Sequence, residues 1–95
     1  INGSATFTFY ALSIEGSITT TNSFNVLSTL SVSLTGSFTA TNGTATFNGT
    51  SNLSGTANLY NVTISATKSL TLGTSSNLGI ANTFTKTGTL DVTTL

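Results

Sequence analysis

The sequence predicts an all-β fold, and three of its features lead to this prediction. About half of the 95 residues are small and polar, with 23 Thr, 14 Ser and 10 Asn. Apolar and polar residues alternate along many short segments, and turn-forming residues separate these segments every six to twelve positions. Thr, Val, Ile, Phe and Tyr favour strands, whereas Glu, Lys and Arg are too few to build long helices.

Charged residues are unusually rare in this chain. Lys and Arg together number 2, Asp and Glu together number 2, and the formal net charge is zero. Only 4% of residues are charged, against roughly a quarter in ordinary domains, while 37% are hydrophobic, so the composition is not that of a disordered chain. Without a basic cluster or a run of about 18 apolar residues, we expect no nucleic-acid partner and no membrane insertion.

The expected strands follow a period-two pattern, in which alternate side chains are buried. In residues 30–34, three apolar side chains alternate with two serines. Shorter alternations occur at residues 7–9, 38–40, 45–47, 60–64, 70–72 and 90–92. Turn clusters lie between them at residues 15–17, 35–37, 42–43, 48–49, 54–55, 72–74 and 87–88. This spacing is typical of a sandwich, a barrel or a β-solenoid.

An internal repeat favours the solenoid among these folds. FYALSI at residues 9–14 has nearly the same order of residue types as LYNVTI at residues 59–64. Residues 24–26 then match residues 78–80, and residues 35–40 match residues 87–92. We therefore predict a single all-β domain, residues 1–95, made of two degenerate repeats at about 5–42 and 43–95. These would stack as about four to five coils with strands roughly 4.8 Å apart.

One lysine interrupts the alternation near the C-terminal end. Strict alternation across residues 83–90 would place Lys86 inside the solenoid with Phe84 and Leu90. Burying an unpaired ammonium group is very costly. We therefore predict a corner at Lys86-Thr87-Gly88 that divides this segment into two strands.

Several segments resemble a known class of repeat. LYNVTI, KSLTLG, SNLGI, NTFTKTGTLDV and GTATFNGT look like successive elements of bacterial and archaeal cell-surface repeats of the filamentous-haemagglutinin and autotransporter-adhesin type. The resemblance covers residues 43–95 well and residues 5–42 more loosely. It implies a right-handed parallel β-helix at the cell surface. The alternative fold is a pilin-like β-sandwich completed by a strand from a neighbouring subunit.

The ends of such a solenoid predict self-association. Natural proteins protect open strand edges with Lys, Pro, inward-pointing charges or a capping element. This chain has no Pro, and apolar residues continue close to both ends, at Ala5, Phe7, Phe9, Leu12, Ile14, Leu90, Val92 and Leu95. We expect these strands to join copies end to end into an extracellular, cell-surface structural fibre, a homopolymer. The alternative function is an adhesive module that binds a surface or glycan ligand.

No catalytic, cofactor-binding or metal site is predicted. General acid–base catalysis needs closely placed titratable groups, but the two acids, Glu15 and Asp91, lie far apart in the sequence. His and Cys are absent, so the many Ser and Thr hydroxyls have no imidazole base to activate them. A calcium site needs several carboxylates close together. We therefore expect a protein that is not an enzyme.

Two covalent modifications remain candidates. Asn-x-Ser/Thr sequons for N-glycosylation occur at Asn2, Asn42, Asn48, Asn52 and Asn61. Some Gram-positive pilins and adhesins cross-link a buried Lys to an Asn with release of ammonia, which makes Lys68 and Lys86 candidates for an isopeptide bond.

Thr-x-Thr pairs raise a further possibility, a flat ice-binding face. Such a face needs Thr pairs at one regular coil spacing. The pairs begin at residues 6, 39, 44 and 83, which do not share a spacing, so we do not expect this face.

Overall fold

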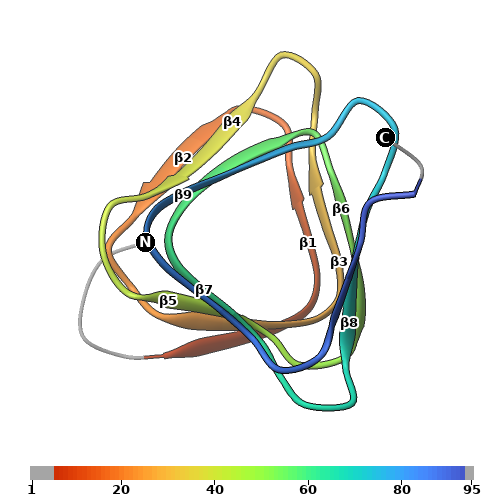
Figure 1. Ribbon diagram of the computed structural model, residues 1–95. Helices are drawn as coiled ribbons and strands as arrows, with labels where there is room; N and C mark the ends of the chain where they lie inside the picture. Colours follow the sequence, from red (N-terminus) through yellow and green to blue (C-terminus); the bar gives the residue numbers. More distant parts are fainter. Residues whose placement is uncertain (1–5, 94–95) are drawn as a thin grey trace.

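The protein is a parallel β-solenoid of about four turns (Figure 1). The computed structural model describes residues 6–93. Its strands are β1 (Phe7–Ile14), β2 (Ser17–Thr20), β3 (Phe24–Val32), β4 (Ser37–Ala40), β5 (Thr44–Phe47), β6 (Thr50–Ser54), β7 (Thr56–Ile64), β8 (Ser69–Leu72), β9 (Asn77–Lys86) and β10 (Thr89–Asp91). Strand pairing is parallel throughout this part of the chain. The solenoid prediction is confirmed, and the sandwich alternative, which requires antiparallel sheets, is wrong.

Each coil is triangular, and its three sides are parallel sheets (Figure 1). Side 1 consists of residues 7–9, 24–26, 44–47, 61–64 and 83–86. Side 2 consists of residues 11–14, 29–32, 50–54, 69–72 and 89–91. Side 3 consists of residues 17–20, 37–40, 56–59 and 77–80. The chain runs from side 1 to side 2 to side 3 in every coil, and β1, β3, β7 and β9 each bend around a corner.

Coil length varies because the corners contain different numbers of residues. Along side 1, Thr8, Asn25, Thr46, Thr63 and Thr85 are successive partners, separated by 17, 21, 17 and 22 residues. The corner from side 2 to side 3 is a single glycine at position 55 in one coil and residues 73–76 in the next. The stacking unit is this coil, and the division into two longer repeats stays a prediction.

The two similar hexapeptides turn different corners. Residues 9–14 pass from side 1 to side 2, whereas residues 59–64 pass from side 3 to side 1. In both, the pairing register shifts around the aromatic residue, between Phe9 and Ala11 and between Leu59 and Asn61. The hexapeptides share a local form, a strand bent at a tyrosine, and they do not stack on one another.

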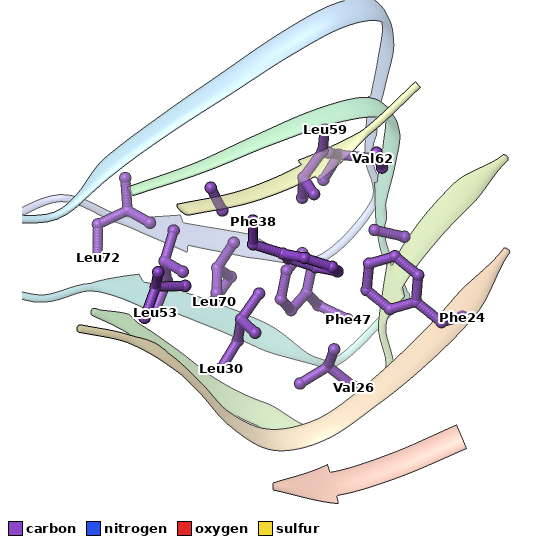
Figure 2. Packing of buried hydrophobic residues seen from close by; sticks show 14 of the residues in the cluster. Phe24, Val26, Leu30, Phe38, Phe47, Leu53, Leu59, Val62, Leu70 and Leu72 are labelled. Atoms are coloured by element: carbon purple, nitrogen blue, oxygen red, sulfur yellow. The ribbon is translucent and has the colours of Figure 1, made fainter. Parts of the chain in front are cut away.

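Inward side chains from all three sides form one apolar core (Figure 2). Phe38, Phe47 and Leu53 are among its largest fully buried members. Few polar side chains enter it. Ser51 does, and its hydroxyl donates a hydrogen bond to the Val26 carbonyl oxygen at 3.3 Å. Every buried polar side-chain atom of residues 6–93 has a hydrogen-bond partner, as a folded interior requires.

Two corners depend on glycine. Gly43 and Gly55 have φ angles of 78° and 84°, a region that L-residues adopt at a cost. A Cβ at Gly55 would also overlap the carbonyl oxygen of Val32 in the neighbouring coil.

The corner predicted at Lys86-Thr87-Gly88 is present, because β9 ends at Lys86 and β10 begins at Thr89.

Candidate functional site: the two open rims of the solenoid

The solenoid has an open sheet edge at each end. The N-terminal rim consists of β1 and β2, which pair only with β3 and β4 respectively. The C-terminal rim consists of β9 and β10, which pair only with β7 and β8. Within residues 6–93, no strand and no helix covers either rim. The outer backbone groups of these strands are therefore available to another strand.

The N-terminal rim is apolar on its inner side. Phe7, Phe9, Leu12 and Ile18 are half-buried against the core, and within residues 6–93 no strand lies on their other side. The Phe7 and Phe9 rings stack with centroids 6.4 Å apart, and Phe9 contacts the Phe24 ring edge-on at 6.5 Å. The aromatic contacts thus continue from the rim into the core. Figure 1 shows β1 and β2 belonging to the same terminal coil.

The C-terminal rim is apolar as well, but it contains a charge. Leu78, Ile80 and Leu90 are half-buried against the core. Phe84 is 39% exposed and Val92 is 47% exposed, both large values for side chains of this type. These five residues lie on the last strands of all three sides or directly after them, where no further coil of residues 6–93 covers them.

Lys86 occupies an inward position on this rim. It is the register partner of Ile64, which in turn aligns with Phe47 and Val26 in the core. Its ammonium group donates a hydrogen bond to the Gly88 carbonyl oxygen at 3.2 Å, so the side chain reaches the corner between sides 1 and 2. An inward-pointing charge on an edge strand is one of the devices that weaken edge-to-edge pairing.

The residues predicted from sequence to mediate self-association fall partly on these rims. Phe7, Phe9 and Leu12 lie on the N-terminal rim, and Leu90 and Val92 lie on or beside the C-terminal rim. Ile14 is only 2% exposed and belongs to the core. Ala5 and Leu95 lie outside the described residues.

Sequence reasoning missed Ile18, Leu78, Ile80 and Phe84 as rim residues. Each of them sits in an ordinary alternating segment, far enough from the chain ends to look like core. Their exposure depends on which coil they occupy, and coil number is set by the lengths of the preceding corners. No local pattern could have marked them.

The C-terminal rim contains a second charged residue, Asp91 on β10. The Asp91 carboxylate accepts hydrogen bonds from the Thr93 backbone N–H at 2.9 Å and from the Thr93 hydroxyl at 2.7 Å. These bonds stabilise the charged form and lower the pKa of Asp91. In the described part of the chain there is no pocket and no group of three or more His, Cys, Asp or Glu that could hold a metal ion.

The candidate modification sites are spread over the corners and outer faces. Asn42, Asn48 and Asn52 are exposed, and Asn2 lies outside the described residues. Asn61 is half-buried, and its side-chain oxygen accepts a hydrogen bond from Asn82 at 2.7 Å. Lys68 and Lys86 are exposed. N-glycosylation and the isopeptide bond stay predictions.

The expectation of no ice-binding face stays a prediction, although two of the Thr pairs lie on side 1. Thr44, Asn61 and Thr83 are successive partners there, and so are Thr46, Thr63 and Thr85. Unequal coil lengths bring unequally spaced pairs onto the same face. Outward hydroxyls stack on side 3 too, where Ser37 donates to Ser17 at 3.2 Å, so this alignment is general and indicates no particular ligand.

Comparison with known proteins gives no match to a family model, to a curated protein or to a solved structure. A search of the described residues for a long apolar helix that could cross a membrane is likewise negative.

Proposed function

We propose that this chain is a non-enzymatic structural subunit or segment of an extracellular surface fibre, in which solenoids associate end to end through their open rims. The proposal rests on one observation, which is that both rims expose strand edges and apolar side chains. Each combines an open strand edge with apolar side chains that pack on one side only, at Phe7 and Phe9 on one end and at Phe84 and Leu90 on the other. A second copy seated on each rim would bury this apolar surface and would pair the backbone groups of the edge strands.

The outer surface supports a structural role. Hydroxyl and amide side chains bond from one coil to the next, for example Ser54 to Ser31 and Asn25 to Thr8, both at 3.2 Å. A net charge of zero removes the repulsion that would separate identical copies. With only two Lys or Arg in the chain, proteases specific for basic residues find few sites, which suits an exposed fibre.

The test is to measure the assembly state of the purified chain. Sedimentation velocity at micromolar concentration should give species that grow with concentration, and negative-stain electron microscopy should show filaments. A single monomeric species over the whole concentration range would contradict the proposal. Binding of a glycan by such a monomer would instead favour the adhesive module.

A matched pair of variants connects assembly to the rim. Leu12→Lys places a charge at a half-buried inward position of β1, whereas Ser13→Lys adds the same charge at the next, outward position. We expect Leu12→Lys to abolish filaments and Ser13→Lys to retain them. Circular dichroism of both variants checks that the coil structure itself is preserved.

A further inference from the structure

We propose that the joint between two copies has a defined polarity and rotation. The C-terminal rim of one copy seats on the N-terminal rim of the next with equivalent sides aligned. Side 1 then continues through the joint, with Phe84 against Phe7 of the next copy and Thr85 beside Thr8 of the next copy. The inference rests on the proposed end-to-end association and adds to it which edges meet and in which register.

The polarity and rotation of the joint are inferred from the core columns, which are the rows of inward side chains that stack from coil to coil. On side 1, Phe7, Phe24, Ala45, Val62 and Phe84 are successive partners, so one inward column begins and ends with phenylalanine. Phe24 has a partner strand on each side in this column and is buried, whereas Phe84, which is followed by no further strand of side 1 among the described residues, is 39% exposed. A second copy placed one strand spacing further on would add to Phe84 the kind of neighbour that Phe24 already has.

Contacts between two rims of the same kind are less favourable than the head-to-tail joint. Two N-terminal rims in contact would pair β1 with itself in an antiparallel sense and leave both C-terminal rims open. Two C-terminal rims in contact would bring both Lys86 ammonium groups into one joint, where like charges repel. The head-to-tail joint is the single kind of contact that covers both rims, and repeated without closure it produces an open filament.

The joint also fixes the subunit spacing. Sides 1 and 2 each contain five strand positions within residues 6–93, and side 3 contains four. If sides 1 and 2 continue without a break, each subunit advances the fibre by five strand spacings, or about 24 Å. Side 3 is then one strand short at every joint, between residues 77–80 of one copy and β2 of the next.

Disulfide trapping tests the register directly, because the natural sequence contains no Cys. Thr8 and Thr85 are exposed, outward residues on opposite rims of side 1. In the proposed joint their Cα atoms are neighbours across parallel strands, about 4.8 Å apart, which is a separation that a disulfide can span. Under mild oxidation, the double variant Thr8→Cys/Thr85→Cys should form a ladder of disulfide-linked multimers on a non-reducing gel.

The controls separate polarity from rotation. Thr19→Cys/Thr85→Cys keeps both thiols on opposite rims but on different sides, because Thr19 lies on side 3, and it should lose the ladder. Each single variant should remain without disulfide-linked multimers. Dimers of Thr8→Cys alone would show two N-terminal rims in contact and overturn the polarity.

The outcomes also distinguish this inference from the proposed function. Filaments that form without a ladder from Thr8→Cys/Thr85→Cys overturn the register and leave end-to-end association standing. An equal ladder from the Thr19→Cys/Thr85→Cys control overturns the rotation. Absence of filaments from the unmodified chain overturns both proposals. A fibre repeat of about 24 Å, measured by electron microscopy, supports the five-strand spacing.

Discussion

Lys86 should limit how tightly two copies join, and its replacement by leucine should strengthen the joint. Residue 86 lies at the end of an inward column formed by Phe9, Val26, Phe47 and Ile64. In the proposed joint, Phe9 of the next copy covers this position. The wild-type ammonium group must then either extend to solvent at the corner where it donates a hydrogen bond to the Gly88 carbonyl oxygen, or lose its hydration at a cost in free energy.

The expected gain in the free energy of association follows from the burial of the leucine side chain in the Lys86→Leu variant. A leucine between Ile64 and Phe9 of the next copy passes from a solvent-exposed rim to a covered core position. Burying a leucine in this way is worth about 1.5–3 kcal/mol. Since 1.4 kcal/mol corresponds to tenfold in affinity, the dissociation constant of the joint should fall about ten- to a hundredfold.

Sedimentation velocity over a concentration series measures this change. Lys68→Leu is the matched control, because it removes the same charge at the same corner one coil earlier, at an exposed position outside the core column. Lys68→Leu should shift the dissociation constant far less than Lys86→Leu. Equal shifts for the two variants, or weaker association of Lys86→Leu, would refute the reasoning from the inward column.

Three further predictions concern the solenoid itself. Gly55→Ala should lower the free energy of unfolding, measured by urea titration, by at least about 1–2 kcal/mol, because Gly55 has a positive φ and lies against the Val32 carbonyl oxygen. Gly16→Ala is the control and should leave the free energy of unfolding unchanged, because a Cβ at Gly16 has no atom within 4 Å. Phe47→Ala removes a fully buried ring and should cost about 3–5 kcal/mol in the same assay. The pKa of Asp91, followed by NMR, should lie below its ordinary value, because Thr93 bonds to the carboxylate. Because the folded pKa is the lower one, this stabilisation is complete above the unfolded pKa and is lost as the pH falls through the folded pKa; Thr93→Val should raise the folded pKa.

The local form of the strands and corners was largely readable from the sequence. Alternation at residues 30–32 and 70–72 marks segments that are strands in the structure, whereas Leu34, the last apolar residue of the alternating run 30–34, lies in a turn and is 87% exposed. The break predicted after Lys86 is present, but Lys86 itself lies at an inward register position, on a rim that leaves it exposed. These features depend on neighbouring residues only. A period of two reports which face of a strand is buried, and a glycine or an asparagine reports a turn, whatever lies in the next coil.

The stacking register was not readable in this way. The similarity of residues 9–14 to residues 59–64 suggested equivalent positions, but the segments lie at different corners, because two strands that bend at a tyrosine have the same local pattern. The irregular starts of the Thr pairs suggested that no common face exists, although two of these pairs, at 44–46 and 83–85, align on side 1. Corners that vary from one residue to several make sequence distance a poor measure of stacking.

Short, half-buried strands with a polar, almost uncharged exterior follow from the residue types and their period, because these act through local sterics and burial. Which of the apolar residues are covered depends on how the coils stack. Ile14 is covered by neighbouring parts of the solenoid, whereas Phe84 and Lys86 belong to a coil that nothing follows among the described residues. Burial in a solenoid depends on the neighbouring coil, and the neighbour is set by pairing between residues about 17 to 23 positions apart.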